Sequence, residues 1–258
     1  MARKIVITSG KGGVGKTTIC ANLGTALAEN NSVCLIDGDI GLNNLDVVMC
    51  IENRIVYDVL DVVSGRCRAK QALVKDATNS NLYVLPSVKG GDIGIDNFIK
   101  IIESLDNLFD FILIDCPAGM DIGFHRAVTV CDEAIVVSTP NISSIRDADK
   151  TISTLNTYNL SSIYLVINMI RRDLVATGEM FSVADISKLL RMSPIGVIPA
   201  DDNVVLANAT TVYNKNKSST AFLMLRDNLL GKSCSIYDDS KGYHGTIGKI
   251  RSRLKRIL

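Results

Sequence analysis

The chain has 258 residues, of which 47% are hydrophobic and 21% are charged, and its mean hydropathy is +0.23. This composition is ordinary for a globular protein, so it excludes wholesale disorder and a fibrous fold. The net charge of +1 argues against a generally basic nucleic-acid binder. The charge is segregated, however: residues 241–258 carry six basic and no acidic residues, which leaves 22 basic against 27 acidic residues, or −5, elsewhere.

The cysteines and the first residues indicate where the protein works. Seven cysteines are scattered along the chain without a C-x-x-C pair, so neither a disulfide framework nor a zinc site is expected. No apolar run approaches 18 residues, and the first strand begins near residue 4, which leaves no room for a signal peptide. We therefore expect a protein of a reducing, cytoplasmic compartment.

Short apolar runs alternate with segments of helical length. The strands are expected at Lys4–Thr8, Val33–Ile36, Leu82–Leu85, Phe111–Ile114, Ala134–Ser138, Ser162–Asn168 and Ile195–Ile198. The helices are expected near 16–29, 55–63, 95–107, 144–157, 183–191 and 219–229. Continuous β-branched runs are typical of strands covered on both faces. The alternation predicts an α/β fold, with a doubly wound, mostly parallel sheet in one domain.

A phosphate-binding loop follows the first strand. The segment GKGGVGKTT matches G-x-x-x-x-G-K-[ST], and it lies between a strand and a helix as this motif requires. Its glycines let backbone N–H groups face phosphate oxygens beside a helix N-terminus. Lys16 would neutralise the β- and γ-phosphates, and the Thr17 hydroxyl would ligate Mg²⁺. The nucleotide-binding residues are expected to be Gly10, Lys11, Gly12, Gly13, Val14, Gly15, Lys16, Thr17 and Thr18.

Two strands end in carboxylates that would complete a phosphoryl-transfer site. An apolar run ends in Asp115, which from the carboxyl edge of the sheet could reach the Mg²⁺ shell. The segment Leu35–Asp39 ends in D-x-D, and Asp39 is expected to orient the attacking water with the help of Asn44. A lone D-x-D is also common in ordinary turns, so it indicates a functional site only because the phosphate-binding loop is present as well. The metal ligands are expected to be Thr17, Asp39 and Asp115.

The turn after Asp115 provides a further candidate. It reads Cys116-Pro-Ala-Gly119, and the Gly119 backbone could approach the γ-phosphate as a switch.

The chain resembles the ParA/MinD family of deviant-Walker ATPases, and within it the branch that determines the septum site. Lys11, a second lysine inside the phosphate-binding loop, is the mark of this signature-lysine class. The resemblance covers about residues 1–230 and the tail. Four segments carry it: GKGGVGKTT, DGDIGLNNLDVVMCIENRIVYDVLDVVSG (37–65), ILIDCPAGMD (112–121) and PNISSIRDADKTISTL (140–155). The second of these is the most specific.

The resemblance implies an ATPase that converts ATP and water to ADP and phosphate, with Mg²⁺ as its metal. It implies a homodimer that forms on ATP binding, attaches reversibly to an anionic membrane and recruits the division inhibitor MinC, with release when MinE stimulates hydrolysis. It implies that Lys11 contacts nucleotide across the dimer interface. The implied location is the inner face of the cell membrane, or the stroma and inner envelope if the gene is plastid-encoded. The implied catalytic residues are Lys11, Lys16, Asp39, Asn44 and Asp115.

The chain departs from the family pattern near the expected adenine end. Asn168-Met169 stands where the family usually has Asn-Arg, and Pro199-Ala-Asp201 stands where it usually has Pro-Glu-Asp. Asn168, at the end of a strand, is expected to hydrogen-bond the adenine. The alternative is that it is an ordinary turn asparagine with its hydrogen bonds satisfied inside the protein.

The chain is expected to divide into a P-loop ATPase domain (1–230), a Gly-, Ser- and Asp-rich flexible linker (231–245) and an amphipathic helix (246–258). On a helix the apolar residues of this tail form one stripe and the basic residues lie outside it, which is typical of a helix that lies in the plane of a membrane surface. A packed terminal helix and a polybasic arm for nucleic acid are the alternatives. The expected membrane residues are Ile247, Ile250, Arg251, Arg253, Leu254, Lys255, Arg256, Ile257 and Leu258.

Other functions remain open at this level. A ParA-like ATPase for DNA or plasmid partition would need basic residues on the core, whose charge of −5 argues against it, so no nucleic-acid partner is expected. An iron–sulfur ATPase would need a suitably spaced cysteine pair, which Cys116 and Cys131 do not obviously supply. A non-catalytic scaffold conflicts with the complete set of phosphate-site residues.

Overall fold

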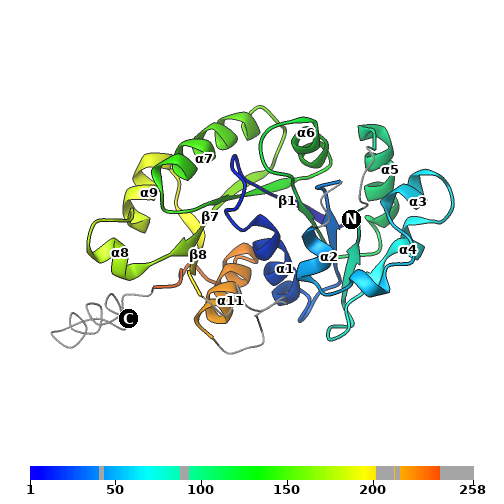
Figure 1. Cartoon of the computed structure of the whole chain (residues 1–258), viewed down its shortest axis with the longest axis horizontal. Helices are drawn as coiled ribbons and strands as arrows, with labels where there is room; N and C mark the ends of the chain where they lie inside the picture. Colours follow the sequence, from blue (N-terminus) through cyan, green and yellow to red (C-terminus); the bar gives the residue numbers. More distant parts are fainter. Residues whose placement is uncertain (41–43, 88–92, 202–211, 213–215, 239–258) are drawn as a thin grey trace.

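The structure is a computed structural model, and it describes residues 1–40, 44–87, 93–201, 212 and 216–238. Within these residues eight strands form one sheet in the order β3-β4-β2-β5-β1-β6-β7-β8 (Figure 1). All neighbouring strands are parallel except β3, which runs antiparallel to β4. The strands are β1 (Arg3–Thr8), β2 (Val33–Asp37), β3 (Val74–Lys75), β4 (Leu82–Leu85), β5 (Phe111–Asp115), β6 (Glu133–Ser138), β7 (Ser162–Ile170) and β8 (Pro194–Pro199).

Helices cover both faces of the sheet, as the doubly wound prediction requires. Figure 1 shows α5, α6 and α7 on one side of the sheet and α1 and α11 on the other. The helices are α1 (Lys16–Leu27), α2 (Asn44–Val48), α3 (Val59–Val63), α4 (Ala69–Ala72), α5 (Ile95–Leu105), α6 (Ile122–Thr129), α7 (Ile142–Leu155), α8 (Arg172–Ala176), α9 (Val183–Leu190) and α11 (Lys217–Leu229), with a 3-10 turn η1 (Glu52–Arg54).

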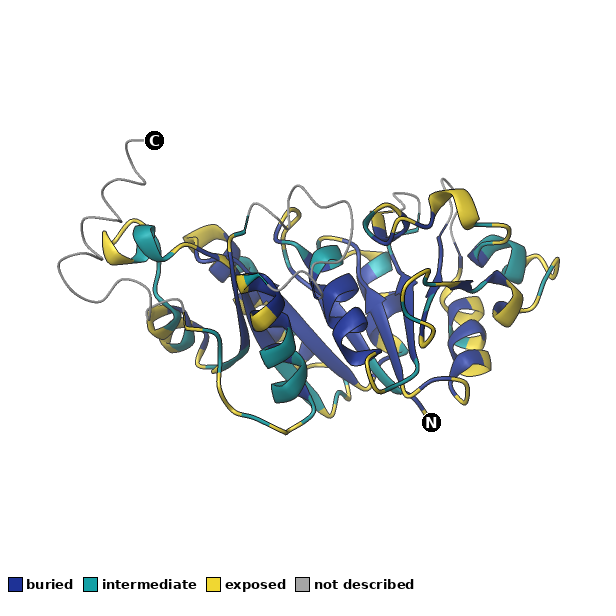
Figure 2. Ribbon diagram, turned by 90° about the horizontal axis from the view of Figure 1, so that it is seen from below, coloured by how far each residue is buried: buried dark blue, intermediate teal, exposed yellow. Residues whose placement is uncertain are grey.

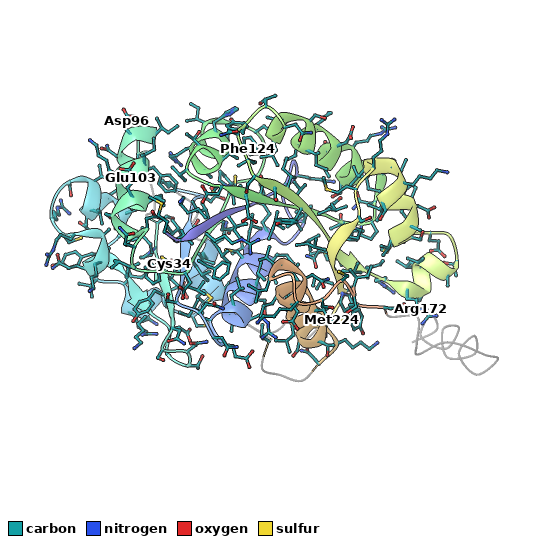
Figure 3. All side chains as sticks on the ribbon, turned by 180° about the vertical axis from the view of Figure 1, so that it is seen from behind. Cys34, Asp96, Glu103, Phe124, Arg172 and Met224 are labelled. Carbon is teal, nitrogen blue, oxygen red and sulfur yellow. The ribbon has the colours of Figure 1, made fainter. Side chains whose placement is uncertain are left out.

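The sheet separates two hydrophobic cores. Successive side chains of a strand point to opposite faces, so in β1 Val6 packs into one core while Ile5 and Ile7 pack into the other. Phe124 of α6, labelled in Figure 3, is fully buried in the first core, and Phe222 of α11 is fully buried in the second. Figure 2 shows the resulting layer of buried strands between the helices. Coverage of both faces explains the continuous apolar strand sequences.

The predicted strands are all present, with ends that differ by no more than two residues. The predicted helix start at residue 55 is wrong, because the helix begins at Val59. Asp58 caps it by accepting hydrogen bonds from the backbone of Leu60 (2.8 Å) and Asp61 (3.1 Å). The sequence reading also missed the two-residue strand β3 and the helices α2, α4, α6 and α8.

The two outer strands of the described sheet are β3 and β8. The first is only two residues long, and the second begins at Pro194 and ends at Pro199. Because proline has no N–H, neither end of β8 can donate a further ladder hydrogen bond.

The described part of the expected linker lies against the domain. The Asn228 side-chain amide donates a hydrogen bond of 2.8 Å to the Ser235 carbonyl, and Ile236 and Tyr237 pack against the two cores. Residues 231–238 therefore extend the packed region beyond residue 230. The rest of the linker and the whole predicted membrane helix, 246–258, lie outside the described residues.

Candidate functional site

The site lies where three adjacent strands end. In the parallel register Ile7 of β1 and Asp37 of β2 are both level with Asp115 of β5. The chain leaves β1 for β2 on one side and returns to β6 on the other, which makes this the point where ligands bind in doubly wound sheets. The topology thus brings together the phosphate-binding loop, the D-x-D segment and the turn after Asp115, as predicted.

The phosphate-binding loop has the backbone that its glycines predict. Gly13 (φ 75°) and Gly15 (φ 92°) lie in the left-handed region that other residues rarely adopt. Helix α1 begins directly after them at Lys16, with no side chain capping its first turn and no acidic residue in it. Its N–H groups and the positive end of its dipole are therefore left for an anion.

Asp115 and Thr17 form a site that suits Mg²⁺. Asp115 is 2% exposed, the Thr17 hydroxyl near it favours its charged form, and its Oδ1 accepts no hydrogen bond from any described residue. Burial raises the pKa of Asp115 to about 7, with nearby Asp37 adding to the shift. A buried carboxylate oxygen without a partner is the group that a hard cation would satisfy.

The protein does not surround such a cation by itself. Among the described residues, no three His, Cys, Asp or Glu side chains are grouped to hold a metal ion. This agrees with Mg²⁺ bound through one or two side chains, since Mg²⁺ usually keeps phosphate and water oxygens as its other ligands.

The two aspartates of the D-x-D segment have different surroundings. Asp37 is 3% exposed and accepts hydrogen bonds from the backbone of Asp39 (3.0 Å) and Leu45 (3.3 Å), and burial raises its pKa to about 6. Asp39 is half-buried. Burial raises the pKa of Asp39, and the positive charge of Lys16 opposes that rise. Asp37 therefore anchors the loop, and Asp39 is the more accessible carboxylate of the pair. Asn44 is exposed at the first residue of α2.

Lys11 is exposed, and its Nζ donates a hydrogen bond of 2.9 Å to Ser143 Oγ at the start of α7. Gly10, just before it, packs on the same helix so tightly that a Cβ would lie 2.6 Å from the Asp147 carbonyl oxygen. The phosphate-binding loop therefore rests on α7. A Cβ on Gly12 would lie 3.8 Å from Ala118, so the loop also faces the turn that contains Gly119 (φ 93°).

Asn168 supports the loop from β7. Its side chain is 5% exposed, and its Nδ2 donates a hydrogen bond of 2.8 Å to the Val14 carbonyl. A Cβ on Gly15 would lie 2.4 Å from the same nitrogen. The structure thus gives Asn168 a partner inside the protein, and its contact with adenine stays a prediction. Of the neighbouring departures, Met169 is 40% exposed and Ala200 is exposed. Asp201, which matches the family pattern, accepts a hydrogen bond of 3.0 Å from the Ser218 hydroxyl.

Two residues at this site were not predicted from the sequence. Ser143 lies inside the segment 140–155 that carries the family resemblance, but nothing there indicated its contact with Lys11, 132 residues away. Arg126 lies just beyond the segment 112–121, and no local pattern indicated its contact with the D-x-D segment. Arg126 could have been noticed only as a charged residue among the apolar residues of its segment.

A pocket of about 280 Å³ opens between the two carboxylate-bearing segments, and it is lined by Gly38, Asp39, Ile40, Pro117, Asp121, Ile122, Gly123 and Arg126.

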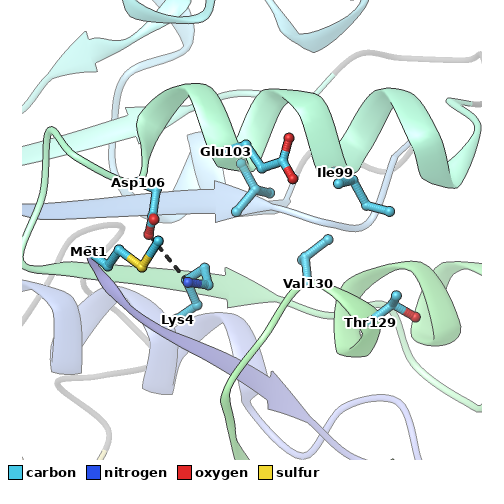
Figure 4. Close-up of a pocket in the computed structure, with 8 residues that line it drawn as sticks. Met1, Lys4, Ile99, Glu103, Asp106, Thr129 and Val130 are labelled. Atoms are coloured by element: carbon cyan, nitrogen blue, oxygen red, sulfur yellow. Dashed lines mark hydrogen bonds and ion pairs between the residues drawn. The ribbon is translucent and has the colours of Figure 1, made fainter. Parts of the chain in front are cut away.

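Another pocket, of about 300 Å³, lies near the amino end of β1, away from the site (Figure 4). There Lys4 pairs with Asp106 at 3.3 Å, between the end of α5 and the end of α6. Its position at the opposite end of the strand separates it from the phosphate site.

Comparisons with known proteins agree with this geometry. Residues 5–212 match the family model described as the CobQ/CobB/MinD/ParA nucleotide binding domain. The septum site-determining protein MinD of Bacillus subtilis (strain 168) is 43% identical over 262 residues, which cover 98% of both chains.

Solved structures give the same result. The MinC:MinD cell division protein complex of Aquifex aeolicus matches with a TM-score of 0.84 and 43% identity, over 90% of this chain and 97% of that one. The septum site-determining protein MinD complexed with Mg-ADP, from Pyrococcus horikoshii OT3, matches with a TM-score of 0.81 and 29% identity, over 91% of this chain and 99% of that one.

Proposed function

The chain belongs to the MinD family of septum site-determining ATPases, and on that premise we propose that it uses ATP to switch between a single chain and a membrane-bound pair. It is an ATPase that uses ATP and Mg²⁺ and acts in placing the division site. The DNA-partition alternative finds no support among these relatives, which are septum site-determining proteins.

The observation that carries the proposal is that Lys16 and Thr17, at the uncapped N-terminus of α1, lie close to the carboxylate of Asp115. Lys16 neutralises the β- and γ-phosphates, and Thr17 and Asp115 hold Mg²⁺. When bound, the metal would spread the negative charge that develops on the phosphates. Asp39, less buried than Asp37, orients the attacking water, and Gly119 offers its backbone to the γ-phosphate side.

We assign Lys11 to the nucleotide of a second copy. Its resting partner is the neutral hydroxyl of Ser143, at 2.9 Å on an exposed surface. A hydrogen bond to a neutral group in water contributes little, whereas a phosphate offers a charge-assisted bond. Lys11 can therefore leave Ser143 at small cost when a partner's nucleotide comes within reach.

The protein partners are proposed from the relatives. The Aquifex aeolicus structure is a complex of MinC with MinD, and we propose a MinC-like protein as the partner that the pair recruits. A MinE-like protein is proposed as the one that stimulates hydrolysis and release.

Membrane attachment is assigned to residues 246–258, which lie outside the described residues. No helix in the part of the chain that the structure describes is long and apolar enough to cross a bilayer. Each basic residue near an anionic surface contributes about 1 kcal/mol, so one short tail should bind weakly and reversibly. Two tails on one pair gain effective concentration, which raises avidity about 10²–10⁴-fold. Pairing alone is then enough to switch attachment.

The decisive experiment is sedimentation with anionic liposomes in the presence of ATP, ADP or no nucleotide. The full chain should sediment with ATP and stay in solution otherwise, and a chain ending at Ser240 should stay in solution in all three conditions while still hydrolysing ATP. Sedimentation of the shortened chain, or sedimentation of the full chain regardless of nucleotide, would contradict the proposal.

A further inference from the structure

We propose that Arg126 is a positioning residue of the ATPase, whose guanidinium holds the loop bearing Asp39 in place against the turn formed by residues 116–121. The inference rests on the proposed role of Asp39 in hydrolysis, and it adds to the site a residue 88 positions away from Gly38 in sequence.

Arg126 is an unusual residue for its place. It lies in α6 among the buried residues Phe124, Ala127 and Val128, and it is itself 5% exposed. Its Nη1 donates a hydrogen bond of 2.9 Å to the Ile93 carbonyl, and its Cζ lies 5.8 Å from the centre of the Phe98 ring. A buried charge is costly unless it is bonded, and an apolar side chain would fill this position without that cost. The cation is therefore placed to do more than fill space.

The second contact of the guanidinium explains what it does. Its Nη2 donates to the Gly38 carbonyl oxygen at 3.4 Å, and that oxygen belongs to the peptide group joining Gly38 to Asp39. The N–H of the same peptide group donates to Asp37 Oδ1 at 3.0 Å. Arg126 and Asp37 thus hold the two polar ends of one peptide plane. That plane fixes the position of the Asp39 Cα and so limits the directions that the Asp39 side chain can take.

The other side of Gly38 is fixed as well. Its N–H donates to the Asp115 carbonyl oxygen at 2.9 Å, and a Cβ on Gly38 would lie 2.8 Å from that oxygen. The loop therefore has no room to settle elsewhere on the β5 side. Arg126 closes the opposite side, where the 280 Å³ pocket would otherwise leave the peptide space to turn.

Helix α6 connects this contact to the turn after Asp115. Asp121 caps the helix by accepting a hydrogen bond of 3.1 Å from the Gly123 backbone, and a Cβ on Gly123 would lie 2.6 Å from Pro117. The helix thus packs directly on the turn. A displacement of the turn would move Arg126, and through the Gly38 carbonyl it would move Asp39.

The test compares the full chain with Arg126→Met and Arg126→Lys. Methionine keeps the stem and removes the hydrogen bonds to the Ile93 and Gly38 carbonyls, so kcat should fall about 10- to 100-fold, as expected for a displaced catalytic group. The affinity for a non-hydrolysable ATP analogue should change less than about threefold, because the phosphate-binding loop is untouched. Lysine keeps the charge without the fork that reaches two carbonyls, so its kcat should fall between those of the parent and Arg126→Met.

The matched control is Arg226→Met. Arg226 is also largely buried, and it pairs with Glu29 and Asp227 at the far end of α1. This variant should lose thermal stability and keep the parent kcat. Amide hydrogen exchange supplies a readout of position: exchange over residues 33–40 should quicken in both Arg126 variants and stay unchanged in Arg226→Met.

The outcomes separate this inference from the function on which it rests. A parent kcat in Arg126→Met, or a loss no larger than in Arg226→Met, overturns it. If Arg126→Met does not fold, Arg126→Lys decides, and parent values of both kcat and exchange in that variant overturn the inference. Undiminished turnover in Asp39→Ala would instead contradict the proposed role of Asp39.

Discussion

Three carboxylates meet at the phosphate site, and their surroundings divide the work among them. Asp37 accepts hydrogen bonds from two backbone N–H groups, Asp115 has a buried oxygen that accepts no hydrogen bond from a described residue, and Asp39 is the most accessible of the three. The same residue type therefore anchors a loop at Asp37 and is left for the proposed metal and water roles at Asp115 and Asp39.

Asp39→Ala should separate binding from turnover. The variant should bind ATP and pair as the parent does, while hydrolysis falls about 100-fold or more, because a water-positioning group acts chiefly in the transition state. With its ATP intact, it should accumulate on liposomes. Turnover, analogue affinity and sedimentation measured together check this, and a parent rate would remove Asp39 from the mechanism.

The nucleotide-free protein should become more stable as the pH falls from 8 to 6. Burial raises the pKa of Asp115 to about 7 and that of Asp37 to about 6, from 3.8 in the unfolded chain. Between these values the folded state holds protons that the unfolded chain has released, so stability is lost as the pH rises through the folded pKa values.

Asp115→Asn is the control for this pH dependence. A domain of this size shifts its Tm by about 2–4 °C per kcal/mol, so the parent should gain a few degrees more than Asp115→Asn over the same pH range. If Tm changes with pH equally in the parent and in Asp115→Asn, ionisation of Asp115 does not destabilise the folded protein.

At this scale the sequence predicts the residues expected to react, but it does not predict the residues that hold them in place. Lys16, Thr17 and Asp115 could be predicted because a contiguous motif and a strand end carry them. The contacts of Arg126 with Gly38, and of Asn168 with Val14, join residues 88 and 154 positions apart. Such contacts depend on which elements pack together, and no local pattern encodes that.

The elements show the same division between strong and weak local signals. Each strand of four or more residues could be predicted because burial on both faces makes its whole sequence apolar. The five-residue helices α2 and α8 and the four-residue α4 could not, because helices this short depend on tertiary contacts rather than on their own propensity. The two residues of β3 pair only because β4 lies beside them.

Substitutions on the apolar face and on the basic face of the predicted tail helix should weaken membrane binding in different ways. Ile250→Glu places a charge in the apolar stripe, so liposome binding with ATP should be lost at every salt concentration. Arg253→Glu exchanges an attraction for a repulsion at the rim, so its loss should be largest at low ionic strength, where screening is weakest. Parallel liposome binding across a salt series checks both.

Neither tail variant alters the phosphate site, so ATP-dependent pairing should survive in both and serves as the control. Parent-like binding by Ile250→Glu would favour a terminal helix packed on the domain.

At the scale of the whole molecule, the exposed lysine of the phosphate-binding loop should decide pairing. Lys11→Ala should stay folded and keep its own nucleotide contacts through Lys16, yet remain a single chain with ATP. Lys100→Ala, which removes an exposed lysine from α5, is the matched control and should pair normally. Light scattering with ATP distinguishes them, and a persistent pair in Lys11→Ala would refute a contact across the interface.

The two edges of the described sheet bear on the proposed gathering of this protein on a membrane surface. Chains held side by side at high local density are liable to join through exposed strand edges, and such joining propagates into fibres. Among the described strands, one border is the two-residue antiparallel strand β3, and the other is β8, which begins and ends with proline. Neither offers a long template for another chain's strand. The proposed cycle of attachment and release would then proceed without the irreversible edge-to-edge growth that removes a protein from solution.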